Sequence, residues 1–217
     1  MDWSASIDAY CERTSEAFWA EPLNAVSNVA FLVAAVAAAR LVSRRAPGDG
    51  AGWFLSVLIG GIGIGSFLFH TYATRWAALA DVLPIAVFIH GYLYFAMRRF
   101  LWLPVWASVA VVVAFFAGST GVERLVPDGA LNGSFGYMPA LLAMLVVGLL
   151  LLGLGRPGGT ALLQAAAVFL VSLTARTFDE AVCGLVPIGI HYVWHMLNAV
   201  VLYLLTRALI VHGRRHA

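Results

Sequence analysis

The sequence is dominated by apolar stretches that are long enough to cross a lipid bilayer as helices. Hydrophobic residues make up 62% of the 217 positions and charged residues 11%, whereas about a quarter of a typical soluble domain is charged. A helix needs about 20 apolar residues to span a membrane, so we expect an all-α membrane protein with seven spans. These lie at about residues 25–42, 52–69, 77–97, 101–118, 137–154, 160–175 and 188–210, after a short surface cap of residues 1–24.

Arginine residues predict how the spans are oriented. The loops after the first, third, fifth and seventh spans contain Arg44, Arg45, Arg98, Arg99, Arg156, Arg214 and Arg215. The opposite side combines many acidic residues with Arg13, Arg75, Arg124 and Arg176. Because cytoplasmic loops are enriched in basic residues, we expect the carboxyl terminus in the cytoplasm and the amino terminus outside. The chain has no lysine, which is typical of a GC-rich bacterial genome and favours a bacterial inner membrane, and its net charge of +2 indicates no nucleic-acid partner.

Two histidines near the start of the last span are the clearest candidate for a metal site. His191 and His195 are four residues apart, so both rings lie on one face of a helix and can reach the same atom. Histidine within a membrane is costly to desolvate and usually faces the bundle interior or a water-filled cavity. The same pair could also ligate haem or hydrogen-bond neighbouring helices.

The predicted topology places further polar side chains at the same depth. The second span ends on the outer side at Ser66 and His70, and the third begins there at Asp81. Together with His191 and His195, His70 would complete a zinc site of the catalytic type, in which the metal lowers the pKa of bound water. Asp81 could then act as general base, and Ser66 could stabilise an oxyanion or position the water.

Each of these residues also has a simpler structural interpretation. His70 could be an interfacial hydrogen-bonding residue, Asp81 could cap the third helix, and Ser66 could hydrogen-bond its own helix. Their shared depth favours the metal site. His90, in the middle of the third span, is interpreted as a packing or cavity-lining residue.

Other polar residues are predicted to have structural roles. Arg176 and Asp179 are three residues apart, and we favour a structural pair over contact with substrate. Three polar residues of the first helix are expected to hydrogen-bond across the bundle: Asn24, Ser27 and Asn28.

The amino-terminal cap contains a cysteine and several carboxylates. Cys11 and Cys183 are both predicted outside, where an oxidising compartment would join them in a disulfide; two unlinked buried thiols are the alternative. Hard cations take several oxygen ligands, so the cap could bind calcium, although acidic surface loops are common. The carboxylates concerned are Asp8, Glu12, Glu16 and Glu21.

Several motifs, in this order along the chain, resemble the alkaline ceramidase family, one of a group of seven-helix membrane hydrolases. They are Cys11-Glu12 and residues 21–28 (EPLNAVSN), 65–70 (GSFLFH), 81–84 (DVLP) and 191–195 (HYVWH). The resemblance implies that the three histidines are zinc ligands and that Ser66 and Asp81 support catalysis.

The same resemblance implies a calcium site formed by Asp8, Glu12 and Glu21, with the Tyr10 carbonyl as a further ligand. Two departures concern this site alone. The spacing from Asp8 to Glu12 is one residue longer than in the family, and Thr14 stands where the family often has asparagine.

The sequence therefore predicts an intramembrane zinc-dependent amidohydrolase that cleaves a ceramide-like N-acyl lipid to a fatty acid and an amine. Three alternatives remain open. A receptor or sensor could keep zinc as a structural element, and a hydrolase could use Ser66 as its nucleophile. A haem-binding electron carrier could use His70, His90, His191 and His195.

Overall fold

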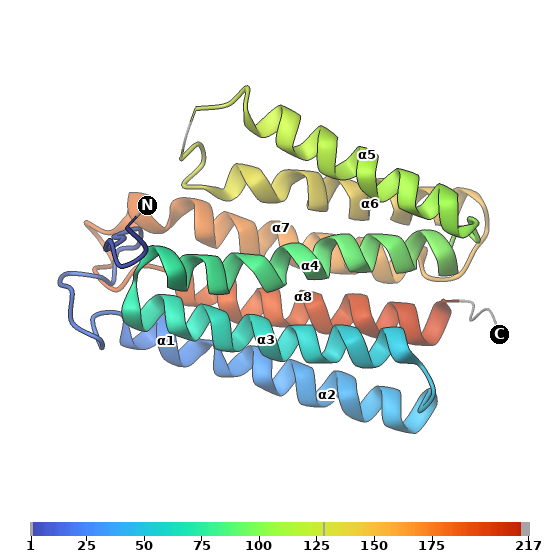
Figure 1. Ribbon diagram of the computed structural model, residues 1–217, viewed down its shortest axis with the longest axis horizontal. Helices are drawn as coiled ribbons and strands as arrows, with labels where there is room; N and C mark the ends of the chain where they lie inside the picture. The colour runs from blue at the N-terminus through green and yellow to red at the C-terminus, as the bar shows by residue number, and fades with distance from the viewer. Residues whose placement is uncertain (1, 128, 214–217) are drawn as a thin grey trace.

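Figure 1 shows the computed structural model, which describes residues 2–127 and 129–213. Arg214 and Arg215, used above to predict the topology, lie outside the described residues. The helices are α1 (Pro22–Ser27), α2 (Val29–Arg45), α3 (Gly50–Tyr72), α4 (Arg75–Arg99), α5 (Val105–Glu123), η1 (Ser134–Tyr137), α6 (Met138–Gly153), α7 (Gly159–Val182) and α8 (His191–His212). The fold is all-α, as predicted, with seven membrane-spanning candidates once α1 and α2 count as one span.

The predicted spans overlap the observed ones, but several ends differ. The fourth was expected from 101, whereas α5 begins at Val105 because Pro104, without an N–H, marks the start of a helix rather than its interior. The sixth was expected to end at 175, at the first charged residue, but α7 continues to Val182. The seventh was expected from 188, whereas α8 begins at His191 because Gly189 has a φ of 64° that belongs to a turn.

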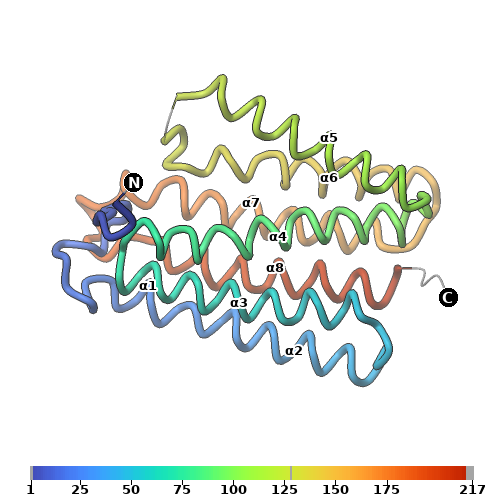
Figure 2. The backbone as a smooth tube through the Cα atoms, in the orientation of Figure 1, coloured from blue at the N-terminus to red at the C-terminus, as the bar shows by residue number. Residues whose placement is uncertain are grey.

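Helix α8 occupies the centre of the bundle. It contacts α1, α2, α3, α4 and α7, and it runs between α3 and α7 in Figure 2. By contrast, α5 lies at the periphery against α4, and Ser108 is its one buried residue. Polar residues at the start of α8 are therefore surrounded by protein, whereas the outer helices present apolar side chains to lipid.

Helices α3 and α4 approach each other closely at Gly65. A Cβ atom at this position would overlap the carbonyl oxygen of Ala80, so only glycine fits. Small residues allow membrane helices to pack at short distance in this way. The approach places Ser66, the next residue of α3, beside Asp81, the next residue of α4.

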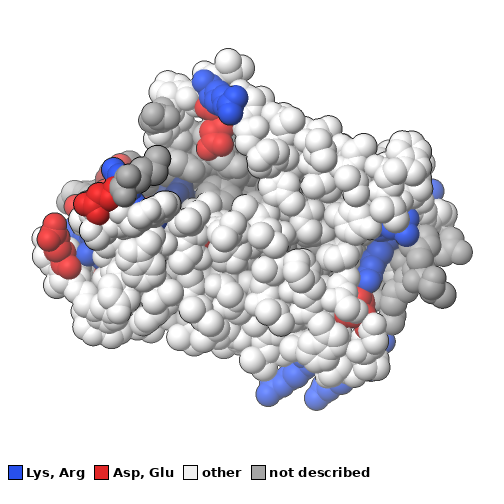
Figure 3. All heavy atoms as spheres, viewed as in Figure 1, with Lys and Arg blue, Asp and Glu red and all other residues white. Residues whose placement is uncertain are grey.

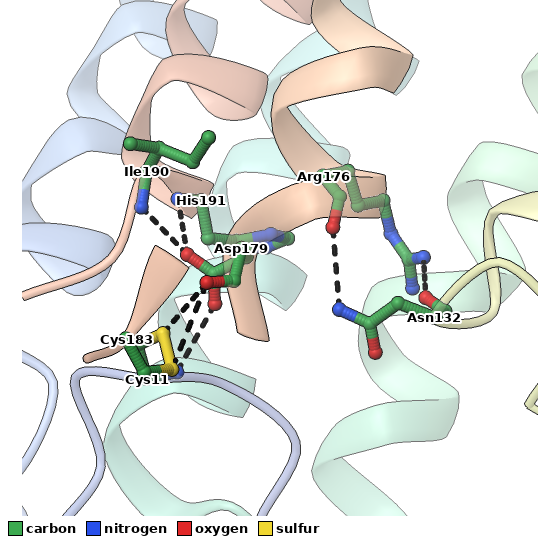
Figure 4. The surroundings of a disulfide bond; sticks show 7 residues. All are labelled: Cys11, Asn132, Arg176, Asp179, Cys183, Ile190 and His191. Carbon is green, nitrogen blue, oxygen red and sulfur yellow. Dashed lines mark hydrogen bonds between the residues drawn. A yellow bond between two sulfur atoms is a disulfide. The ribbon is translucent and has the colours of Figure 1, made fainter. Parts of the chain in front are cut away.

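The cap is attached both to the turn between α3 and α4 and to the end of α7. Its backbone pairs with the turn between α3 and α4, where Ile7 N–H donates to the Ala73 carbonyl at 2.7 Å. The predicted disulfide between Cys11 and Cys183 is confirmed and ties the cap to the end of α7 (Figure 4). The cap thus closes the end of the bundle at which α8 begins.

Charged residues separate between the two ends of the bundle. Helices α2, α4 and α8 end in arginine or histidine at the end away from the cap. In Figure 3 acidic side chains gather mainly at the cap end, and basic side chains at the opposite end. This separation is the asymmetry on which the topology prediction rests.

One largely buried ion pair lies at the arginine-rich end, and its contribution to the stability of the fold should depend on pH. Arg99 donates to both carboxylate oxygens of Asp49 at 2.7 Å, and Gly52 N–H adds a third hydrogen bond at 3.1 Å. Burial alone would raise the pKa of Asp49, but these hydrogen bonds outweigh it and hold the pKa below its ordinary value. The pair therefore stabilises the fold while Asp49 is ionised.

We expect Arg99→Gln to destabilise the protein by about 1–3 kcal/mol at pH 7, because the buried carboxylate loses its charged partner. The difference from wild type should be complete above the ordinary aspartate pKa of about 3.9 and shrink as the pH falls through the lowered value. Thermal unfolding in detergent measures it, with exposed Arg44→Gln as the control. Equal melting temperatures for the two variants would refute the assignment.

Candidate metal centre

Three histidines converge at the cap end of the bundle, as predicted. His70 lies in the last turn of α3, and His191 and His195 lie in the first two turns of α8. One ring nitrogen from each lies within 4.8 Å of the others, and each residue is 1% exposed. The three histidines therefore form a buried group that could hold a metal ion.

The ring of His70 is oriented by a carboxylate from the cap. Its Nδ1 lies 2.6 Å from Glu21 Oε2, and the other oxygen of Glu21 pairs with Arg13 Nε at 2.5 Å. Burial by itself would raise the pKa of Glu21, but the hydrogen bonds with His70 and Arg13 outweigh it and hold the pKa below its ordinary value. An ionised Glu21 accepts the Nδ1 proton of His70 and so leaves Nε2 free to bind a metal.

The ring of His195 is oriented by the first helix. Ser27 Oγ donates to the Asn24 carbonyl at 2.8 Å, so its lone pair is left to accept from His195 Nδ1 at 2.7 Å. With the proton on Nδ1, Nε2 is again the unprotonated nitrogen. The expected hydrogen bond across the bundle is thus confirmed for Ser27, whereas the Asn28 amide bonds back to the Asn24 carbonyl.

His191 is held from its backbone and covered on one face. Asp179 Oδ1 accepts from the N–H groups of Ile190 and His191, and Oδ2 accepts from Cys11 N–H at 3.0 Å (Figure 4). The Tyr10 ring stacks on the His191 ring with centroids 3.7 Å apart. Nδ1 of His191 is buried without a hydrogen-bond partner, so this ring keeps a nitrogen that the described residues leave unsatisfied.

The two predicted catalytic residues lie beside this cluster. Ser66 Oγ is 3.5 Å from His195 Nε2, and Ser66 also interacts with the Asp81 carboxyl. Asp81 interacts electrostatically with His70, and its Oδ1 is buried with no hydrogen-bond partner. The sequence prediction that Ser66 and Asp81 share a site with the histidines therefore agrees with the structure.

The pair predicted between Arg176 and Asp179 does not form. Asp179 is fully occupied by the three backbone N–H groups described above, whereas Arg176 Nη1 donates to the carbonyl of Asn132 and to Ser134 Oγ. Figure 4 shows the two side chains pointing to different partners. Spacing of i and i+3 favoured a local pair, but long-range partners satisfy both groups better.

The predicted calcium ligands are not gathered into a site. Glu12 accepts from the N–H groups of Leu23 and Asn24 and so caps α1, and Asp8 is exposed. The Tyr10 carbonyl accepts from the N–H of Arg13.

The remaining predicted ligand, Glu21, already has a cation. The guanidinium of Arg13 pairs with it, donates to the carbonyls of Ser15 and His70, and is buried. Among the described residues, the three histidines are the one group of potential ligands that comes together. Glu21 is thus paired with Arg13, and the calcium site remains a prediction.

An apolar cavity lies directly below the cluster. Its lining includes Ile62, one helical turn before Ser66 on α3, and Asn198, three residues after His195 on α8. From there it continues between helices α3 to α8 along apolar side chains such as Phe88 and Leu162. A metal at the histidines would stand at the head of this cavity.

His90 is not part of the site, in agreement with its interpretation as a packing residue. Its ring packs against Phe115 and Phe116 of α5, and Nδ1 lies 2.7 Å from the Ala86 carbonyl.

Comparison with known proteins adds no assignment: no protein-family model matches the chain, and no curated protein matches it either.

We expect Glu21→Gln and Ser27→Ala each to lower the affinity for a bound metal by about 10- to 100-fold, because each removes a group that fixes a ligand tautomer. Competition with a chelator of known affinity measures the change. The exposed Ser43, which bonds only its own helix, provides the matched control Ser43→Ala. Unchanged metal affinity in both Glu21→Gln and Ser27→Ala would show that these contacts do not orient metal ligands.

Proposed function

We propose that the protein is an intramembrane zinc-dependent amidohydrolase that cleaves a ceramide-like N-acyl lipid to a fatty acid and an amine. The observation that carries the proposal is the convergence of three buried histidines beside Asp81 and Ser66, at the head of an apolar cavity. The resemblance of the sequence motifs to the alkaline ceramidase family supports the same reaction.

The three histidines fit a zinc ion. Imidazole nitrogen is a preferred zinc ligand, and the hydrogen bonds that Nδ1 of His70 and of His195 donate to Glu21 and Ser27 leave both Nε2 atoms unprotonated. Three protein ligands with a fourth position open are typical of catalytic rather than structural zinc. A bound zinc ion would supply Lewis acidity, which makes water nucleophilic near neutral pH and polarises the amide carbonyl.

The residues beside the histidines supply proton transfer and oxyanion stabilisation. Asp81 accepts a proton from the attacking water through its unpaired Oδ1 and returns it to the leaving nitrogen. As the C–O bond forms and the C–N bond breaks, the Ser66 hydroxyl donates to the oxygen on which negative charge develops. The products are a fatty acid and an amine, which balances the addition of one water.

The apolar cavity fits the acyl chain of such a substrate. It begins within a turn of Ser66 and His195, so a chain lying in it would place its carbonyl carbon at the histidines. A chain in an apolar cavity gains burial energy along its length. That binding energy would hold the amide next to the reacting groups.

We expect His70→Ala to lose both zinc and hydrolysis, because it removes one ligand of three. Asp81→Asn should keep its zinc and lose about 10²- to 10⁴-fold in kcat, because only proton transfer is removed. Elemental analysis and release of fatty acid from a panel of N-acyl lipids measure the two effects. His90→Ala, which changes a histidine outside the site, is the control and should keep both.

Other outcomes would favour the alternatives. Zinc and hydrolysis retained in His70→Ala would show that the mechanism is wrong. Bound zinc without turnover of any lipid amide or ester would indicate a receptor or sensor. A visible absorption band would indicate haem, since zinc is colourless. Chelator-resistant hydrolysis that Ser66→Ala abolishes would indicate a serine nucleophile.

A further inference from the structure

One partly buried arginine near the histidines, Arg176, forms no ion pair with a carboxylate of the described residues. The hydrogen bonds of Arg176 go to the carbonyl of Asn132 and the hydroxyl of Ser134, and it also interacts with the Tyr10 side chain. Its guanidinium lies 5.8 Å from the centroid of the Trp194 ring. All of these partners are neutral, and among the described residues no carboxylate forms an ion pair with Arg176.

Two other arginines are paired with carboxylates, whereas Arg156, at the end of the bundle away from the cap, donates to the carbonyls of Phe100 and Leu101. Arg13 pairs with Glu21, and Arg99 pairs with Asp49. A charge taken out of water is costly unless a counter-charge accompanies it, and ionisable residues within membrane spans often mark a binding path. Arg176 is therefore an arginine near the histidines that has no carboxylate ion pair in the described part of the chain.

Arg176 lies close to the histidines, because its guanidinium is 5.8 Å from the ring centroid of Trp194, the residue before His195. It interacts electrostatically with His191 and His195, whereas Asp81 interacts with His70. Arg176 and Asp81 influence each other without forming an ion pair. Asp81 of α4 and Arg176 of α7 thus both interact with the histidines and do not form an ion pair with each other.

The position of Arg176 along α7 indicates which part of a substrate it would meet. Phe169 lines the apolar cavity, and Arg176 is seven residues, or about two turns, nearer the cap. An acyl chain in the cavity would have its carbonyl at the histidines. The amine part of the substrate would therefore lie at the cap end, within reach of Asp81 and Arg176.

Building on the amidohydrolase function proposed above, we propose that the amine part of the substrate carries a carboxylate that Arg176 binds, so that the substrate class is N-acyl amino acids. Asp81 serves the nitrogen of the scissile amide, and Arg176 binds the carboxylate attached to the neighbouring carbon. The planar guanidinium offers paired donors that match a carboxylate. Arg176 is in this account a specificity-determining residue, whereas bond cleavage belongs to the groups around the histidines.

A purely structural role for Arg176 makes a different prediction. Its contact with Asn132 joins the loop before η1 to α7, and Asn132 Nδ2 returns a hydrogen bond to the Arg176 carbonyl at 3.2 Å. A loop anchor would affect all substrates equally, whereas a carboxylate-binding group discriminates by charge. The two roles are separated by substrates that differ only in that charge.

The experiment compares N-dodecanoylglycine with N-dodecanoylglycinamide, which is neutral, on the zinc-loaded full chain in detergent. The readout is the ratio of the two kcat/KM values for release of dodecanoic acid. We expect wild type to prefer the acid and Arg176→Gln to lower the ratio about 10- to 100-fold, as for loss of a charged hydrogen-bonded pair. Arg176→Lys should restore part of the ratio.

The control variant is Asn132→Ala, which removes one link of the loop but keeps the carbonyl that accepts from Arg176. It should leave the ratio at the wild-type value. A ratio that is equal in wild type and Arg176→Gln overturns the inference, even if both proteins hydrolyse the amides. Turnover of ceramide by a wild type that does not turn over N-dodecanoylglycine also overturns it, while the amidohydrolase function stands.

Binding provides a readout that does not depend on turnover. If zinc-loaded wild type hydrolyses neither compound nor ceramide, the proposed reaction fails, and thermal stabilisation by the two compounds then tests Arg176 alone. Selective stabilisation by N-dodecanoylglycine that Arg176→Gln abolishes supports the carboxylate site. Equal stabilisation by the acid and the amide overturns it.

Discussion

The buried carboxylate of Asp179 is the interaction on which the geometry of the site depends. In a membrane-embedded bundle, backbone N–H groups at the start of a helix must find protein partners, and α8 has no side-chain cap of its own. Asp179 reaches from α7 to accept from Ile190 and His191, and it accepts from Cys11 of the cap as well. One side chain thus fixes where α8 begins, how its two histidines face α3, and where the cap lies. The adjacent disulfide joins two of these segments, the cap and the end of α7.

The charges of the cap are used to build the histidine cluster. Arg13 helps to hold Glu21 ionised, and Glu21 in turn orients His70. One carboxylate thus connects an arginine of the cap with the histidine cluster. Arg176, at the same end of the bundle, forms no ion pair with a carboxylate in the described part of the chain. The two arginines thus differ in their partners, a carboxylate for Arg13 and neutral groups for Arg176.

Local patterns in the sequence predicted more than long-range ones. Apolar length predicted the seven helices, and the spacing of His191 and His195, with the arginine distribution, predicted their shared depth with His70. A hydrogen bond of Ser27 across the bundle was predicted, but the histidines that Ser27 and Glu21 orient were not, because Glu21 is 49 residues from His70 and Ser27 is 168 from His195. Their roles depend on which helices are neighbours. The predicted pair of Arg176 and Asp179 failed for the same reason: distant partners outcompete a neighbour three residues away.

X-ray absorption at the zinc edge on the purified full chain tests the central claim most directly. If the three histidines hold a catalytic zinc ion, the spectrum should show one zinc per chain with three imidazole ligands at about 2.0–2.1 Å and one further light atom. The same spectrum recorded on His70→Ala should lose this coordination shell. A wild-type spectrum with sulfur ligands, with oxygen ligands only, or without zinc would contradict the account.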